Sequence, residues 1–436
     1  MAAPLRLRWY TVATAVLFVL VAPAAAAQPV ALLPAELSML VAAAIDTHPS
    51  IKRARANRRA ALQDIDAARR AKWPTVSATT EANVGGADTT SQVAAIRIEQ
   101  TLWDQGGQEA RIAAVTTGAD ISALQLDLEQ QDLAMQTINA WQALLAAQRR
   151  YNAANATVNV IAGFKAQMAR RVDAQASPAI DLELVDARLL QTQVERLSAE
   201  NNVQLALQNL SRLTGITDLS ARPWAAPSQV AAPLTRAGEA AFEAAISRAN
   251  WDAVVQGHPL VTKARLEYSQ VGEQLRAKQA DRWPQAYARI DQPLANNPLT
   301  GSNQATLLVG LRYTPGAGFS TQLEAQALAT RLEAQAFEID KVARTVDQLI
   351  YDDQQTFSVS VAHAAAQSLS LAGSQRVLAS YERQFQAGRK TWQDLLNAAR
   401  EVAQNAFSLS DTQSTIQGAM YRLQVRLGVL STMTEH

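Results

Sequence analysis

The stretch HPSIKRARANRRAALQDIDAARRAKWP, which runs from His48 to Pro74, occurs a second time in altered form. The second version reads HPLVTKARLEYSQVGEQLRAKQADRWP and runs from His258 to Pro284. Each version indicates a helix that ends before its Trp-Pro pair, because proline cannot continue a helix. A repeat distance of about 210 residues far exceeds the roughly 20–50 residues of a solenoid unit. We therefore predict an internal duplication that gives the chain two similar halves.

The first residues form a separate targeting signal. Arg6 and Arg8 precede an apolar run over residues 11–22, and residues 25–27 offer an A-x-A cleavage site. This pattern is typical of a secretory signal peptide, so we expect residues 1–27 to be removed. A permanent N-terminal anchor is the alternative.

Composition narrows the class of protein. The 40 basic and 39 acidic residues nearly cancel, which argues against nucleic acid as a partner. The chain has no cysteine, so disulfides, thiolate sites and a lipid-bearing cysteine are not expected. After the signal peptide, no run reaches the roughly 18 apolar residues of a membrane-spanning helix. An exported chain of this kind is either soluble outside the cytoplasm or held in an outer membrane by strands.

Four segments indicate β-strands. Apolar and polar residues alternate within them, as at Ile96, Arg97 and Ile98. Each is about 10 residues long, the length that a tilted strand needs to cross a bilayer. Four strands cannot close a barrel alone, because the smallest membrane barrels have about eight; several chains would have to share one. The predicted strands cover residues 75–84, 93–102, 285–294 and 305–314.

Between the strands, the sequence predicts unusually long helices over residues 107–172 and 318–387, with shorter partners over 178–213 and 389–427. Some 65 helical residues at about 1.5 Å each would extend about 100 Å. Their apolar stripe is thin, which is typical of coiled-coil pairs with much wetted surface. A plain helical scaffold is the alternative. We divide the chain into a first repeat at 28–215, a Pro/Ala-rich linker at 216–236 and a second repeat at 237–436.

No enzymatic chemistry is indicated. The chain has 4 histidines, and His48 and His258 occupy equivalent helix starts, so we interpret them as turn residues rather than metal ligands. The HExxH, Walker and GxSxG motifs are absent from the sequence. We predict neither a cofactor nor a metal site, and expect the protein not to be an enzyme.

The segment Leu102–Gly107, which follows a predicted hairpin and opens a long helix, resembles the barrel-to-helix turn of the TolC family of outer-membrane channels. The C-terminal stretch from Tyr381 to Gly388, with the continuation to Ala398, resembles that family's most typical segment. The resemblance implies a mainly α fold with a small β part. Three copies would form one 12-stranded β-barrel in the outer membrane of a Gram-negative bacterium, continued by an α-helical tunnel across the periplasm.

The resemblance also implies a gate at the periplasmic helix tips. Asp181 matches an aspartate that links neighbouring helices, and Lys390 matches its basic partner. Asp394 matches an aspartate whose three copies form an acidic ring, in which like charges would raise one another's pKa. Phe385 stands where the family has a gate tyrosine, and Asn397 stands where it has a second ring aspartate, so both depart from the pattern.

The barrel-to-helix turns are the second group of implied sites. Asp104, Gly106 and Gly107 match the family's Asp-Gly-Gly turn. In the second half, Gly316 and Gly318 belong to a different sequence, Pro-Gly-Ala-Gly, which should still break the strand.

As function, the resemblance implies a homotrimeric exit duct in contact with outer-membrane lipid. It would receive cargo from an inner-membrane ABC or RND transporter through a periplasmic adaptor protein. The His-Pro to Trp-Pro openings resemble members that serve type I protein secretion, which we favour. Tripartite efflux of small molecules and a periplasmic coiled-coil scaffold are the alternatives.

Overall fold

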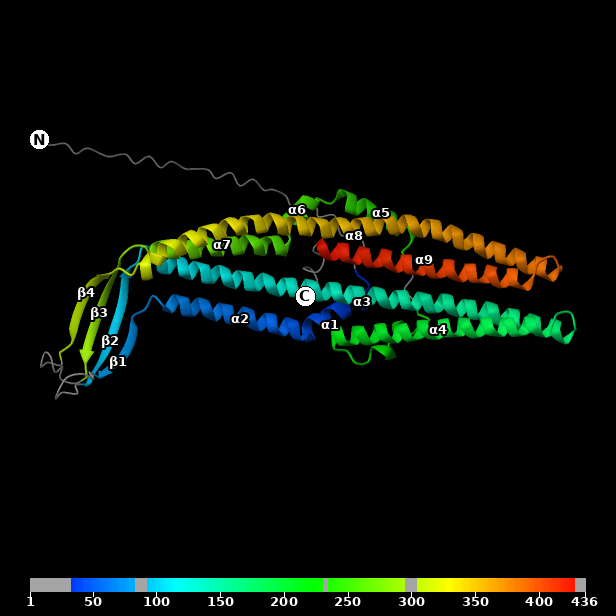
Figure 1. Cartoon of the computed structure of the whole chain (residues 1–436), viewed down its shortest axis with the longest axis horizontal. Coiled ribbons are helices and arrows are strands. Elements are labelled where there is room, and N and C mark those ends of the chain that lie inside the picture. The colour runs from blue at the N-terminus through cyan, green and yellow to red at the C-terminus, as the bar shows by residue number, and fades with distance from the viewer. Residues whose placement is uncertain (1–32, 83–91, 230–233, 295–303, 428–436) are drawn as a thin grey trace, which may run out of the picture.

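A computed structural model describes residues 33–82, 92–229, 234–294 and 304–427. The molecule is elongated, with a sheet at one end and long helices running to the other (Figure 1). The predicted signal peptide and the two predicted hairpin loops lie outside the described residues.

The first half begins with two shorter helices and continues through a strand pair into a long helical hairpin. Its elements are α1 (Ala35–Thr47), α2 (Pro49–Arg70), β1 (Thr75–Ala82), β2 (Gln92–Trp103), α3 (Gly107–Asp173) and α4 (Ala179–Thr214). Two short 3-10 turns follow, η1 (Leu219–Ala221) and η2 (Pro223–Ala225).

The second half repeats this order. Its elements are α5 (Arg236–Arg248), α6 (Trp251–Gly257), α7 (Pro259–Ala280), β3 (Gln285–Pro293), β4 (Thr306–Arg312), η3 (Ala317–Phe319), α8 (Ser320–Gln386) and α9 (Trp392–Arg426). Helices α2 and α7 both have 22 residues, and α3 and α8 both have 67. Equal lengths allow residues of the two halves to be matched by position in each helix.

The duplicated histidines start equivalent helices. Each is the N-cap of its helix, and its Nδ1 accepts a backbone N–H, from Ser50 at 3.3 Å for His48 and from Leu260 at 3.2 Å for His258. Burial and the nearby Arg426 lower the pKa of His258 to about 4, so its ring stays neutral and able to accept. The repeated His-Pro therefore has a local structural role at each helix start.

The sheet has two chemically different faces. Its order is β1-β2-β3-β4, antiparallel throughout, and one row across it consists of Val76, Ile98, Ile290 and Leu307. These four side chains are 38–68% exposed. The next row has the opposite orientation and is polar. One face of the sheet thus carries exposed apolar side chains that no other described part of the chain covers.

The polar face is held by ion pairs. Arg97 Nε lies 2.8 Å from Asp291 Oδ1, and Arg289 Nε lies 2.8 Å from Asp291 Oδ2. Arg312 Nη2 lies 2.7 Å from Glu99 Oε1 and so links β4 to β2 across β3. A face of paired charges opposite an apolar face is the alternation found in strands that separate lipid from water.

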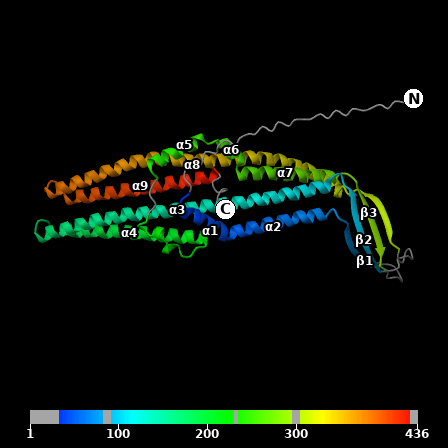
Figure 2. The same cartoon turned by 180° about the vertical axis from the view of Figure 1, so that it is seen from behind.

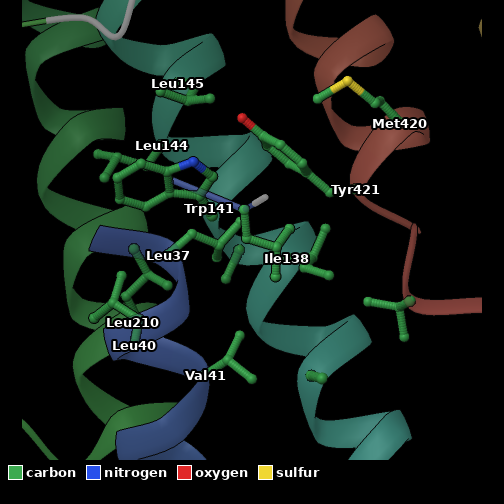
Figure 3. Close-up of a cluster of buried hydrophobic side chains, with 14 of the residues drawn as sticks. Leu37, Leu40, Val41, Ile138, Trp141, Leu144, Leu145, Leu210, Met420 and Tyr421 are labelled. Carbon is green, nitrogen blue, oxygen red and sulfur yellow. The ribbon is translucent and has the colours of Figure 1, made fainter. Parts of the chain in front are cut away.

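The main hydrophobic core lies at mid-length, where α1 packs on α3 and α4. Figure 3 shows Trp141 and Ile138 of α3 facing the α1 side chains Leu37, Leu40 and Val41, with Leu210 of α4 beside them. The linker is strapped over this core, because Gln148 Nε2 donates to the backbone oxygens of residues 224 and 226. The core thus fixes the linker between the two halves.

A partly buried cluster of charged side chains joins the two halves where α9 meets α3. Asp353 of α8 accepts from Arg422 at 2.8 Å and from Arg426 at 2.7 Å, both on α9. Arg422 also donates to Gln142 of α3 at 3.0 Å. The Asp353 carboxylate therefore orients the Arg422 side chain, which connects α9 of the second half to α3 of the first half.

Asp353→Asn should lower the free energy of unfolding by roughly 3 kcal/mol or more, because two largely buried arginines lose their counter-charge. Chemical denaturation measures this change. The neighbouring Asp352 is exposed, so Asp352→Asn is the matched control and should change stability by less than about 0.5 kcal/mol. Equal stability losses in the two variants would contradict the assigned role of Asp353.

Candidate functional site

The two interhelical turns lie side by side at the end remote from the sheet (Figures 1 and 2). One joins α3 to α4 and the other joins α8 to α9. Gln175 in the first turn and Gly388 in the second adopt positive φ, 53° and 72°. All five gate residues implied by the resemblance lie in or near these turns.

Asp181 and Asp394 occupy equivalent places, since each is the third residue of its helix. Only Asp394 has a cap to hold it. The Thr391 backbone N–H and hydroxyl donate to Asp394 Oδ2 at 3.1 and 2.8 Å, and the Asp394 N–H donates to the Thr391 hydroxyl at 3.2 Å. This reciprocal pair is a capping box.

The same contacts set the charge of Asp394. Hydrogen bonds from the Thr391 side chain and backbone lower the pKa of Asp394, and the charge of Lys390 acts in the same direction. Lys390 Nζ lies 3.8 Å from Asp394 Oδ2 and 4.4 Å from the ring centroid of Tyr381. In the single chain, Asp394 is therefore an ionised cap residue with a basic neighbour.

Asp181 differs from Asp394 because the N-cap residue of its helix is Pro178, which provides no side-chain cap. Its side chain is half-buried, and within the described chain it forms no ion pair with Lys390, which lies beside Asp394 instead. An Asp181–Lys390 link would thus have to form between two copies. Of the two aspartates, Asp181 is the more available to a partner.

Phe385 belongs to an aromatic cluster that fastens the two tips together. Trp392 lies between Phe385 and Phe164, with centroid distances of 5.0 and 5.6 Å. Arg171 of α3 stacks on the Phe385 ring at 4.9 Å and donates to Ser177 at 3.2 Å. A phenyl ring suits this buried position, because a tyrosine hydroxyl would need a hydrogen-bond partner there.

Asn397 is exposed one turn beyond Asp394. It lines a groove between the tips with side chains of α4 and α9. The other lining residues are Leu184, Ala187, Arg188, Gln191, Gln393 and Leu396.

At the opposite end of α3, the predicted turn has clear physical roles for its residues. Asp104 Oδ2 accepts the Gln108 N–H at 2.6 Å, so Asp104 caps α3. Gly106 has φ 77°. A Cβ on Gly107 would lie 3.0 Å from Ala280 Cβ, so glycine permits α7 to approach α3.

The turn between β4 and α8 also leads from a strand into a long helix, but with a different backbone conformation. Gly316 and Gly318 have φ 76° and 59°, and Phe319 also adopts a positive φ of 60°. Thr321 ties the turn back, as its hydroxyl donates to the Pro315 carbonyl at 2.8 Å. Positive φ at a phenylalanine is uncommon and was not predictable from the sequence pattern.

Comparisons with known proteins relate part of the chain to a family. The family model described as "Outer membrane efflux protein" matches residues 40–216. The matched segment, which is less than half of the chain, is similar to that family. It covers most of α1 and all of the first half through α4, including the tip with Asp181.

The solved structures agree in fold over nearly the whole chain. CusC has a TM-score of 0.76 at 14% identity, covering 90% of this chain and 91% of that one. The outer membrane protein VceC of Vibrio cholerae gives 0.74 at 15%, covering 90% and 96%. The CmeC outer membrane channel of Campylobacter jejuni gives 0.73 at 12%, covering 90% and 86%. At such identities the match establishes a shared fold. No curated protein sequence matched.

Within the described residues, no helix combines the length and apolarity needed to span a membrane. The same residues contain no group of three side chains suited to hold a metal ion.

Trp392→Ala should loosen the two tips from each other, because it removes a 5%-exposed ring that contacts both Phe164 and Phe385. Hydrogen exchange of the amides in residues 385–396 should become at least tenfold faster. Trp73, 73% exposed near the sheet, supplies the control Trp73→Ala, which should leave these amides unchanged. If hydrogen exchange is unchanged in Trp392→Ala, the aromatic cluster does not hold the two tips together.

Proposed function

We propose that three copies of this chain assemble into an outer-membrane channel, each contributing four strands to a 12-stranded barrel. The observation that carries the proposal is the sheet, which has an apolar face, a polar face and two unpaired edges. Among the described strands, β1 pairs only with β2 and β4 only with β3. In lipid, unpaired edges are not tolerated, and neighbouring copies would satisfy them.

Helix α4 supports the same assembly, because it carries two apolar stripes. Val185 and Val203 face inward and are fully buried. On another face Leu190, Val194 and Leu197 are 54–65% exposed at the spacing of a coiled-coil seam. A helix with two such seams needs two helical neighbours along its length. Among the described residues, α4 packs along α3 and meets α1 near its C-terminal end, where Leu207 and Leu210 are buried. A neighbour for the exposed seam would come from another copy, closing a helical tube.

The helix tips would then form the gate at the periplasmic end of this tube. We assign Asp181, Lys390 and Asp394 to it as charged residues, Phe385 as part of the fastening within each copy, and Asn397 as a groove residue. The exposed tips would also receive a periplasmic adaptor, which connects the duct to an inner-membrane ABC or RND transporter.

For the cargo, we infer proteins exported by the type I route. The support is the resemblance of the duplicated His-Pro to Trp-Pro openings to secretion-type members. Small-molecule efflux is the second candidate, favoured by the description of the family model that matches residues 40–216.

Asp394→Asn should weaken the block of single-channel current by divalent cations added on the periplasmic side, because a ring of three carboxylates would lose its charge. The concentration for half block in planar bilayers measures this. Asp173→Asn, which neutralises an exposed acid on the other tip, is the control and should leave the block nearly unchanged. An unaltered block in Asp394→Asn would exclude Asp394 from the constriction, and a detergent-free soluble monomer would exclude the channel itself.

A deletion strain distinguishes the two cargoes. If the duct serves secretion, a protein should disappear from the culture medium while sensitivity to dyes, detergents and antibiotics stays as in the parent. Raised sensitivity with an intact set of secreted proteins would overturn the secretion assignment in favour of efflux. Complementation with the intact chain controls for effects on neighbouring genes.

A further inference from the structure

Helix α2 is a strongly basic and exposed helix in a chain whose net charge is only +1. Within the described residues, its ion pairs are Arg53–Glu129 at 3.1 Å and Arg55–Asp46 at 3.8 Å. Its other five basic side chains are exposed and form no such pair. Between Pro49 and Arg70 the basic residues are Lys52, Arg53, Arg55, Arg58, Arg59, Arg69 and Arg70, and the acidic ones are Asp64 and Asp66.

The duplicate of α2 is covered on two sides, whereas α2 is covered on one. Helix α7 contacts both α8, its own long helix, and α3 of the other half. Among the described helices, α2 packs mainly along α3, its own long helix, and has a small contact with α1. Figure 1 shows α7 lying against α8 and α2 running below α3.

Matched residues locate the uncovered side. Ile51 and its equivalent Val261 are both fully buried against their own long helix. By contrast, the α7 residues Ala277 and Ala280 are buried, and their α2 equivalents Ala67 and Arg70 are exposed. Ala280 is the residue that approaches Gly107 of α3. The side of α2 that corresponds to the α3-facing side of α7 thus has no cover.

We propose that α8 of a second copy covers this side of α2, as α3 covers α7 within the chain. The inference rests on the proposed trimer and specifies one of its contacts. Helices α3 and α8 are equivalent in the two halves and have equal lengths. The contact between α7 and α3 therefore predicts the register of the proposed contact between α2 and α8 of the second copy.

The register follows from one hydrogen bond. Gln270 Nε2, on the twelfth residue of α7, donates to the carbonyl of Ala114, the eighth residue of α3, at 3.2 Å. The twelfth residue of α2 is Ala60, and the eighth residue of α8 is Ala327. Ala60 of one copy is therefore opposite Ala327 of the next to within about one helical turn, since Gln270 also lies against Gly118 of α3.

Charge supports this pairing. Over residues 320–353, α8 has seven acidic and three basic side chains, opposite in balance to α2, although one of the acids, Asp353, is already paired with Arg422 and Arg426 of its own chain. In the derived register Lys52 comes opposite Gln335, one helical turn from Glu338, whose partner within its own chain is Lys341 at 3.0 Å. The acidic residues are Glu324, Glu333, Glu338, Asp340, Asp347, Asp352 and Asp353, and the basic ones are Arg331, Lys341 and Arg344.

The positions of one intrachain ion pair can also be matched in this contact. Arg111 of α3 bridges to Asp281, which follows α7. The position in α8 equivalent to Arg111 is Glu324, and the position after α2 is Ala71, next to Arg70. Glu324 already pairs with Lys278 of its own chain, and Arg70 of the neighbouring copy would lie near this pair. Such charges would align the copies during assembly and make it sensitive to salt.

Cysteine cross-linking tests the register directly, because the chain has no cysteine of its own. The full-length variant Ala60→Cys/Ala327→Cys, in outer-membrane vesicles, is treated with a short bifunctional thiol reagent and run on a denaturing gel. Covalent trimers are expected. The control Ala60→Cys/Ala334→Cys moves one cysteine about 10 Å along α8 and should remain mostly monomeric.

Charge exchange tests the electrostatic part on the same cross-linking background. Lys52→Glu and Glu338→Lys should each reduce the yield of covalent trimer at least twofold in low salt, and combining them should restore it. Native mass spectrometry of the same samples counts the copies. Native trimers with no cross-link at Ala60 and Ala327, or no restoration on exchange, would overturn this inference and leave the proposed channel intact. Absence of trimers would overturn the proposed function itself.

Discussion

The constraint on which the rest of the structure depends is the need to satisfy the backbone hydrogen bonds at the two edges of the sheet. The four strands form a sheet with an apolar face and a face of paired charges. Its edge strands, β1 and β4, each have one unpaired edge among the described strands. In a membrane such edges have to be paired, and only another copy offers a matching edge. The helices also need neighbouring copies, because α2 and α4 each leave one side uncovered.

The duplication determines how that demand is met. Each half supplies two strands, a short helix and a long hairpin. In the proposed trimer, contacts between the halves within a chain would therefore be a template for contacts between chains. The halves differ where specificity is needed. Asp394 is held by the Thr391 cap and accompanied by Lys390, whereas Asp181 follows Pro178 and remains available. Helix α2 has seven basic and two acidic residues, whereas its duplicate α7 has four and two.

Much of this could be predicted from local sequence. Runs poor in proline and glycine indicated the longest helices, and Trp-Pro pairs marked the passage to strands. The capping box at Thr391 and Asp394 is a local motif and was open to prediction. The cluster of Phe164, Phe385 and Trp392 was not, because it joins segments more than 200 residues apart through side-chain contacts that have no sequence signature.

The central claim is that three copies complete what one chain leaves open. Native mass spectrometry of the detergent-extracted protein tests it most directly, since it counts the chains in the intact particle. The account predicts a particle of three chains that needs detergent to stay in solution. A stable single chain in detergent-free buffer would contradict it.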